Sequence, residues 1–326
     1  YSTLERLPNG NFGLLWESNG YRNITFSSFS PDWLGGVCAP LHVAVPDSAQ
    51  AGTTADVRVT VTNQEPHPLT GASLQLDLPT GWSANAVDLP TVPSGQNITV
   101  SVPVTIPKGT STNGYPVSAV LTTRQGQHSH SSWEAPSIVV TGGDVVWQDS
   151  TERHYDGQHL TDVSDEVEKV KDLESGAIRV RFRTSTSAPA AGSLLSLADP
   201  ISQVRDLVLS LNSGRPYLEV RTASGTYPVR IQTGVNVADG EWHDLIAASS
   251  NGVTSLILDG KVIGQQRSQG FFSTITELTH PYPGLNPDGV PNLTIGGNQA
   301  YVASQGGTTN RWMFDGDIAS VEVYNG

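Results

Sequence analysis

The stretch "PYLEVRT" carries three different polar side chains at alternating positions. Successive side chains of a strand point to opposite faces, so Leu218 and Val220 are expected to face a core. Tyr217, Glu219 and Arg221 then share the other face. The arginine fork suits bidentate binding of a carboxylate, and a neighbouring glutamate can orient that fork or accept hydrogen bonds from a ligand. The alternative is an ordinary ion pair on a solvated strand face, which contributes about 0–1 kcal/mol to stability.

A second candidate site lies in "TTNRWMFDGDI", at the end of a long loop rich in Gly, Ser and Thr (residues 296–310). Loops at the rim of a β-sandwich often carry binding groups, which makes Arg311 and Trp312 a candidate pair. Alternatively, Trp312 is a core residue and Arg311 is its solvated neighbour.

Other chemistry is sparsely represented. The sequence contains no Gly-x-Ser-x-Gly elbow, no phosphate-binding loop and no His-Glu-x-x-His motif. His128 and His130 in "HSHSSWE" are interpreted as solvated loop residues or, alternatively, as part of a metal site. The single cysteine, Cys38, excludes an intramolecular disulfide and is expected to be a buried or boundary thiol. We predict no cofactor and no catalytic metal, and leave a structural calcium ion open.

Composition narrows the function classes. The chain of 326 residues has 31 acidic and 18 basic side chains and a net charge of −13. Nucleic-acid binders and proteins that bind anionic membranes concentrate Lys and Arg, so both classes are disfavoured. No apolar run approaches the roughly 20 residues that span a bilayer. Many glycines and prolines, with short Val- and Thr-rich runs, indicate an all-β protein with many turns.

Three segments must position these residues. Residues 1–37 hold strands around a Pro-Asn-Gly turn and are too short to bury their own core. Residues 38–141 show period-2 alternation, as in "VRVTVT", "LQLDL" and "ITVSVPVTI", which predicts an immunoglobulin-like β-sandwich. Residues 144–326 form the largest block, which we interpret as a jelly-roll sandwich with one short helix.

Two local signals stand out in this last block. The stretch "DVSDEVEKVKDLE" (residues 162–174) predicts the helix, with Ser164 as its N-cap and with Val163, Val167 and Val170 on one face. The dipeptide Asp259-Gly260 between "SLIL" and "KVIG" predicts a tight hairpin, because both positions of the favoured turn need positive φ.

Residues 1–37 resemble the C-terminal end of the catalytic propeller of bacterial exo-α-sialidases (glycoside hydrolase family 33), through "YSTL", "PNGNFGLLWE" and "ITFSSFSPDWL". The resemblance implies that Tyr1 is the nucleophile of the whole enzyme and that Glu17 supports an arginine of the carboxylate-binding triad. Sialidases are an exception to the two-carboxylate rule of glycosidases. The arginine triad, the acid/base aspartate and the activating glutamate are expected upstream, in a missing catalytic propeller. We therefore expect this chain by itself to be inactive as an enzyme.

Residues 38–141 resemble the immunoglobulin-like domain attached to many carbohydrate-active enzymes, which implies a spacer role. Residues 144–326 resemble family 40 carbohydrate-binding modules, which are laminin-G-like, concanavalin-type sandwiches that bind sialic acid, through "SLLSLAD", "YLEVRT", "DGEWHDLIA", "LILDGKVIG" and "FDGDIASVEVYN". The resemblance implies that Glu219 and Arg221 contact sialic acid. Arg311 would be the second arginine and Trp312 the accompanying aromatic residue.

The resemblance is incomplete. The loop before "FDGDI" is longer than in the family, and the chain reads "LADP" at 197–200 where the family often has a polar segment near the ligand. Weaker binding, or binding of a different sugar, would follow from the loss of those polar contacts.

Together these patterns predict part of a secreted or cell-surface bacterial sialidase, which releases terminal sialic acid from glycoconjugates. The chain itself is expected to bind sialylated glycans, such as mucin-type glycoproteins, through its C-terminal module. The alternatives are a pair of structural spacer domains, or a laminin-G-like module that binds another carbohydrate.

Overall fold

A computed structural model of the chain describes residues 2–8, 12–18, 23–29, 37, 39–124, 126–131, 135–170, 173–184, 191–198, 206–222, 224–268, 292–298 and 312–326. Tyr1, Cys38 and Arg311 lie outside the described residues. Within the described part nearly all regular structure is β-strand, which confirms the all-β class.

Contacts divide the chain into two units, and each is described by itself. The first unit comprises Tyr1–Pro46, Thr54–Thr105 and Pro116–Pro136, and the second comprises Asp47–Thr53, Ile106–Tyr115 and Ser137–Gly326. Residues 47–53 and 106–115, which fall in the predicted immunoglobulin-like domain, thus group with the C-terminal residues. The boundaries 1–37, 38–141 and 144–326 stay predictions.

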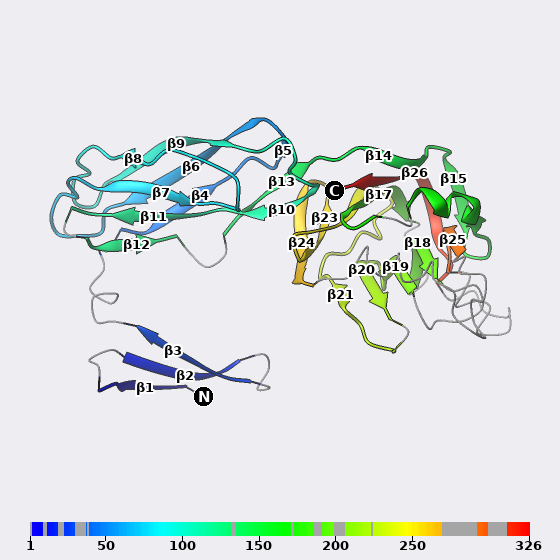
Figure 1. Ribbon diagram of the computed structural model, residues 1–326, viewed down its shortest axis with the longest axis horizontal. Coiled ribbons are helices and arrows are strands. Elements are labelled where there is room, and N and C mark those ends of the chain that lie inside the picture. Colours follow the sequence, from blue (N-terminus) through cyan, green and yellow to red (C-terminus); the bar gives the residue numbers. More distant parts are fainter. Residues whose placement is uncertain are drawn as a thin grey trace. The chain divides into compact units, whose positions relative to one another are not determined.

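The N-terminal residues of the first unit form a three-stranded antiparallel sheet, drawn in blue in Figure 1, of β1 (Ser2–Arg6), β2 (Phe12–Ser18) and β3 (Asn23–Phe29). Apolar side chains on this sheet remain exposed, among them Leu4, Ile24 and Phe26. Among the described residues of this segment, no apolar side chain before Val37 is buried, in line with the prediction. Its assignment to a propeller stays a prediction.

The rest of the first unit contains two further sheets. One has the strand order β4 (Leu41–Ala44), β6 (Thr54–Thr62), β9 (Asn97–Thr105). The other has the order β12 (His128–His130), β11 (Ser118–Thr122), β7 (Ser73–Asp77), β8 (Val87–Asp88). Burial alternates along β6 and β7, with Val57, Val59 and Val61 fully buried, so the predicted period of two is confirmed.

A small sheet joins segments that are distant in sequence. Its order is β10 (Asn113–Pro116), β13 (Ser137–Thr141), β5 (Ser48–Gln50), and β13 and β5 are parallel. Almost all of this sheet belongs to the second unit.

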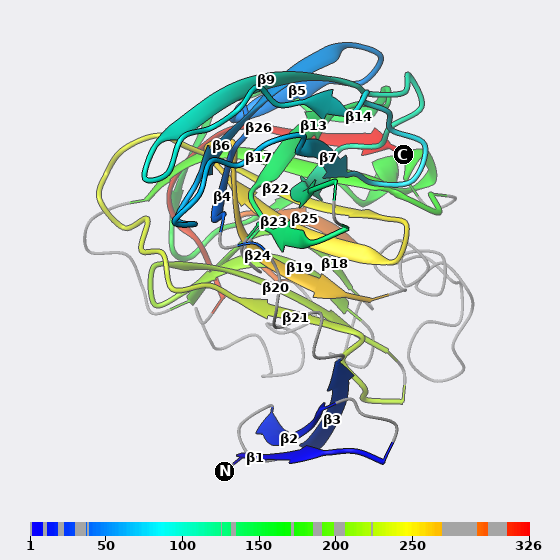
Figure 2. The ribbon, with the colours of Figure 1, turned by 90° about the vertical axis from the view of Figure 1, so that its left-hand side faces the viewer.

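Two antiparallel sheets build the sandwich of the second unit (Figure 1 and Figure 2). The first sheet has the order β14 (Val145–Asp149), β26 (Asp315–Asn325), β17 (Gly176–Thr184), β22 (His243–Ser250), β23 (Val253–Leu258), β24 (Lys261–Arg267), and β15 (Arg153–Asp156) also pairs with β26. The second has the order β16 (Thr161–Asp162), β25 (Asn292–Ile295), β18 (Ala191–Ala198), β19 (Asp206–Asn212), β20 (Arg215–Arg221), β21 (Val229–Gln232).

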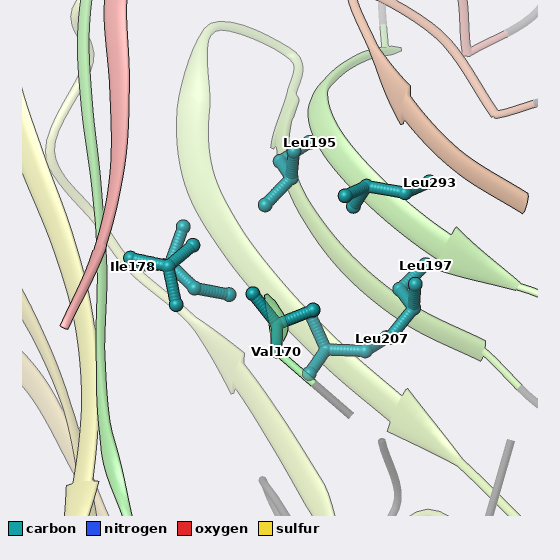
Figure 3. A pocket seen from close by; sticks show the side chains of 7 residues that line it. Val170, Ile178, Leu195, Leu197, Leu207 and Leu293 are labelled. Carbon is teal, nitrogen blue, oxygen red and sulfur yellow. The ribbon is translucent and has the colours of Figure 1, made fainter. Parts of the chain in front are cut away.

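One apolar core holds these two sheets together. It includes Val180 and Phe182 from β17 and Leu207 and Leu209 from β19, all fully buried. A gap of about 10 Å³ between the sheets is lined entirely by apolar side chains, six of which are labelled in Figure 3. This gap is at the lower limit of size for one water molecule and offers it no polar partner. It is a small packing defect of the core and not a ligand site.

The predicted helix is wrong in length and in its cap. The structure has a six-residue 3-10 helix, η1 (Ser164–Lys169), which is preceded by Val163 without a side-chain cap. The carboxylate of Asp162 accepts hydrogen bonds from the backbone N and the hydroxyl of Ser164, while the Ser164 hydroxyl accepts one from the backbone N of Leu293. Ser164 therefore joins the turn to β25 instead of capping a longer helix. The apolar face is confirmed, because Val167 packs into the core.

The tight turn at Asp259-Gly260 is confirmed by φ values of 48° and 78°. Ser213-Gly214 and Asn251-Gly252 adopt the same pair of positive φ angles, which the sequence analysis did not identify. The first of these turns joins β19 to β20 and so sets the register of the strand that carries the candidate site.

Candidate functional site

The candidate site is built on β20, in the second sheet of the sandwich. Leu218 and Val220 are fully buried in the core, as the alternation predicts. The opposite face is not an ordinary solvated one, because Tyr217 is only 4% exposed. Glu219 and Arg221 are half-buried. These three side chains share one face, but the arginine that contacts Tyr217 and Glu219 comes from another strand.

That arginine is Arg230 of β21, which lies directly opposite Glu219 in the register. The Tyr217 hydroxyl donates to Oε2 of Glu219, and Nε of Arg230 donates to the Tyr217 hydroxyl over 2.9 Å. Nε of Arg230 also lies 3.5 Å from Oε2 of Glu219. We call these three residues the Tyr217 cluster. Sequence reasoning missed Arg230, although alternation in "PVRIQ" places it outward between the buried Val229 and Ile231.

The environment keeps the phenol of this cluster protonated. Burial and the hydrogen bond to the Glu219 carboxylate raise the pKa of Tyr217 to about 12, against a smaller lowering by Arg230. At neutral pH Tyr217 is therefore the donor to Glu219 and the acceptor from Arg230. The cluster is a connected network of carboxylate, phenol and guanidinium.

Trp312 lies beside this cluster. Its ring centroid is 6.4 Å from that of Tyr217, with an angle of 34° between the planes. Its backbone has a φ of 69°, which is unfavourable for a bulky side chain. The backbone N of Ser193 donates to the Trp312 carbonyl over 3.0 Å, and Gly192 and Trp312 form an isolated parallel β-bridge. Pairing with β18 thus holds Trp312 next to Tyr217, and its side chain is half-buried and not part of the core.

Arg221 and Arg230 share one aromatic neighbour. The guanidinium carbon of Arg221 is 5.7 Å from the centroid of the Tyr227 ring, and that of Arg230 is 5.2 Å from it. These are cation–π distances. Tyr227 lies between β20 and β21 and is exposed, so it connects the two cations at the edge of the site.

Buried hydroxyls continue the same face across β19 and β18. Ser210 lies opposite Tyr217, Ser193 lies opposite Ser210, and Ser196 lies opposite Val208. All three serines are at most 1% exposed, and within the described structure none of their hydroxyls has a hydrogen-bond partner. The part of the sheet face next to the Tyr217 cluster is therefore polar although it is buried.

The first sheet of the sandwich carries a similar arrangement, which we call the Tyr324 cluster. The Tyr324 hydroxyl donates to Oε2 of Glu322, and Nη1 of Arg179 lies 3.5 Å from the same oxygen. Here the arginine has a second carboxylate, because its Nε and Nη2 are each 3.1 Å from Oδ1 of Asp244. A tyrosine, a glutamate and a cross-strand arginine therefore do not by themselves mark a ligand site.

Glu17, Tyr1 and Arg311 are the remaining predicted site residues. Glu17 lies on β2, half-buried and opposite Ile24 in β3. Tyr1 and Arg311 lie outside the described residues, so the role of Tyr1 as nucleophile and the pairing of Arg311 with Trp312 stay predictions.

Metal ligands do not gather in the part of the chain that the structure describes, where no three His, Cys, Asp or Glu side chains could hold an ion. His128 and His130 are both exposed on β12, with ring centroids 6.4 Å apart. Within the same residues, no helix has the length and apolar character that a membrane span requires.

Family models match two parts of the chain. The model of the NPCBM-associated NEW3 domain of alpha-galactosidase matches residues 49–124, and the laminin G domain model matches residues 182–326. The second match contains every residue of the Tyr217 cluster and Trp312. The laminin-G-like nature predicted for the last block is confirmed by this match.

Over 130 residues, or 40% of its length, the chain is 39% identical to a sialidase from Micromonospora viridifaciens. The match spans 19% of that protein, so the chain corresponds to about a fifth of its curated relative. Among solved structures, the CBM40 module of the Ruminococcus gnavus IT-sialidase bound to α2,3-sialyllactose is 22% identical, with a TM-score of 0.44 over 56% of this chain and 92% of that one. The same module bound to α2,6-sialyllactose is 24% identical, with a TM-score of 0.43 over 56% of this chain and 93% of that one.

Proposed function

We propose that the sandwich of residues 144–326 binds sialylated glycans on the outer face of β20. The observation that carries this proposal is the gathering of Tyr217, Glu219 and Trp312 on one buried polar face. Its hydrogen-bonding groups, aromatic ring and cations match the chemistry of an acidic sugar.

Each residue has a distinct role in this proposal. Arg221, with Arg311, binds the ligand carboxylate, because a guanidinium offers paired donors to two carboxylate oxygens. Glu219 accepts hydrogen bonds from hydroxyl or amide groups of the ligand. Trp312 packs against the apolar face of the sugar ring. Sequence identity to a sialidase supports a role in sialoglycan processing.

An array of sialosides and matched neutral glycans, probed with the wild-type chain and Arg221→Ala, tests this proposal. We expect wild type to bind sialosides selectively and the variant to lose roughly tenfold or more in affinity. Absence of sialoside binding by the wild type would refute the proposed ligand. Equal binding by the two proteins would refute the role of Arg221.

We further propose that the whole protein is a secreted or cell-surface bacterial exo-α-sialidase that acts on mucin-type glycoproteins. In it Tyr1 would be the nucleophile, Glu17 would support a triad arginine, and the sandwich would retain the enzyme on multivalent substrates. Residues 1–37 contain only two arginines, Arg6 and Arg22, which is fewer than the triad needs. We therefore expect this chain to leave a fluorogenic sialoside uncleaved, and turnover by the purified chain would contradict the assignment.

A structural role is the second candidate, and the Tyr324 cluster favours it. There a similar set of residues forms a hydrogen bond and ion pairs within the sheet, and its arginine contacts two carboxylates of the chain. If the Tyr217 cluster only stabilises the sheet, the array will show no glycan binding of any kind. Binding confined to neutral glycans would instead identify a module for another carbohydrate.

A further inference from the structure

Arg230 is held firmly at one end of its guanidinium. Its Nε donates to the Tyr217 hydroxyl over 2.9 Å and lies 3.5 Å from the Glu219 carboxylate. The Tyr227 ring lies 5.2 Å from the guanidinium carbon, and the backbone N of Arg230 donates to the Gln266 side chain over 3.0 Å. Two side chains therefore orient the guanidinium, and a third packs near it.

The other end of the same guanidinium is open. The Arg230 side chain is 62% exposed, and no described residue accepts a hydrogen bond from its Nη1 or Nη2. The printed contact with the Glu219 carboxylate is made through Nε, so the pair Nη1 and Nη2 is not required for it. Such a pair of parallel donors is the arrangement that binds a carboxylate with two hydrogen bonds.

The Tyr324 cluster provides an internal comparison. Its Arg179 has similar tyrosine and glutamate partners, but it also contacts Asp244 through Nε and Nη2, both at 3.1 Å. One arginine therefore meets two carboxylates and the other meets one. The Arg179 side chain is also less exposed, at 39%. Among the described residues, Arg230 has no counterpart of the second carboxylate that completes the Tyr324 cluster.

We propose that Arg230 is a carboxylate receptor. Its Nη1 and Nη2 bind the carboxylate of the ligand, which serves as the second carboxylate partner that Arg179 finds within the chain. The ligand's identity as a sialic acid rests on the proposed function, whereas the receptor geometry does not. Tyr217 is a positioning residue for this guanidinium, and Glu219 positions it in addition to its proposed contact with the ligand, because both side chains contact Nε. Two strands then supply cations to the ligand carboxylate, β21 through Arg230 and β20 through Arg221.

Calorimetric titration of the full chain with 3′-sialyllactose, and with lactose as the neutral control, tests the role in affinity. The variants are Arg230→Gln, which removes the charge, Arg230→Lys, which keeps the charge without the fork, and Arg179→Gln as the matched control. We expect both Arg230 variants to lose roughly tenfold or more in affinity, with Arg179→Gln unchanged. Wild-type affinity in both Arg230 variants overturns the inference while leaving the proposed function intact.

A second titration separates the receptor from the ligand's identity. The guanidinium 1H–15N signals of Arg230, assigned by their loss in Arg230→Lys, are followed as sodium acetate is added, with sodium chloride as the control for ionic strength. Shifts specific to acetate support the receptor even if sialyllactose does not bind, in which case only the proposed function fails. Neither acetate nor sialyllactose shifting these signals overturns the inference.

Discussion

At the scale of single residues, Glu219 lies between a phenol from its own strand and a guanidinium from the next one. The Tyr217 hydroxyl donates to it, and Nε of Arg230 lies 3.5 Å from the same oxygen. Because Tyr217 is buried, its hydroxyl has little access to water. Its hydrogen bonds to Glu219 and from Arg230 therefore define its role. Each of the three side chains is therefore positioned by the other two.

The first prediction concerns Tyr217→Phe. The ring stays buried but Glu219 loses its donor, so we expect unfolding in urea to show a loss of about 1–2 kcal/mol at pH 8. The pH dependence has a definite sign. Unfolded chains ionise the phenol near pH 10, whereas the folded-state pKa of Tyr217 is about 12. Stability of the wild type should therefore fall as pH rises from about 10 to 12.

Comparing wild type with Tyr217→Phe at pH 8 and pH 10.5 checks this effect, because the variant lacks the ionising group. The difference in unfolding free energy between the two proteins should be smaller at pH 10.5. An equal difference at both values would show that the folded-state pKa is not raised.

At the scale of the element, β18 holds the tryptophan of the site through close backbone contact. Gly192 bridges Trp312, and a Cβ added to Gly192 would lie 2.9 Å from Cα of Phe314. Real Cβ atoms are essentially never that close to a backbone carbon, so the strand and the segment 312–314 meet only because position 192 has no side chain.

The second prediction is that Gly192→Ala separates β18 from this segment. We expect a loss of about 1–3 kcal/mol in the unfolding free energy and a changed near-ultraviolet circular dichroism spectrum, because Trp312 moves from Tyr217. Gly234→Ala is the control, since no atom lies within 4 Å of its added Cβ. Equal stability of the two variants would argue against close packing at Gly192.

The third prediction concerns His243, which connects the turn between β23 and β24 to the loop before β22. Its Nδ1 lies 2.8 Å from a carboxylate oxygen of Asp259, and its Nε2 lies 3.1 Å from one of Asp239. Burial lowers the pKa of His243, but these two hydrogen bonds raise it more, so the net pKa stands above the usual 6.5. The protonated ring therefore joins two carboxylates.

We expect His243→Gln to lose about 1–2 kcal/mol of stability at pH 5.5 to 6, where the wild-type ring is charged. The folded-state pKa is the raised one, so this contribution is complete below about 6.5 and disappears as pH rises through the folded value. Urea unfolding of both proteins from pH 5.5 to pH 9 measures the difference. A difference that grows with pH would contradict the proposed ion pairs.

At the scale of the whole molecule, side chains connect the C-terminal sandwich to a segment more than a hundred positions earlier. Asn113 is buried, and its Nδ2 donates to the Ser250 hydroxyl over 3.0 Å and to the Val253 carbonyl over 3.1 Å. Its Oδ1 accepts from the Ser255 hydroxyl. This network explains why residues 106–115 group with the second unit.

The fourth prediction is that Asn113→Ala destabilises the second unit by about 2–3 kcal/mol, because it leaves several buried polar groups unpaired. Amide hydrogen exchange in β22 and β23 should speed up. Asn97→Ala, at an exposed position of β9, is the control. Unchanged exchange in β22 and β23 would show that the sandwich does not depend on residues 106–115.

Much of this protein follows from local pattern. Alternation along β6 and β20 determined which side chains enter a core, and Asp259-Gly260 determined a turn, because these preferences belong to one strand or one dipeptide. A short helix is present in the predicted stretch, but Ser164 does not cap it, because its hydroxyl is bonded to Asp162 and to the backbone N of Leu293 in β25, and no local pattern contains β25.

The sequence by itself determined that Tyr217, Glu219 and Arg221 share a face, since chain geometry alone requires it. Only the tertiary structure decided that Arg230 completes the cluster, that Trp312 lies beside Tyr217 and that Tyr217 is buried. Strand register and the packing of distant segments arise from contacts between residues far apart in sequence, and these contacts turn a pattern on one strand into a candidate site.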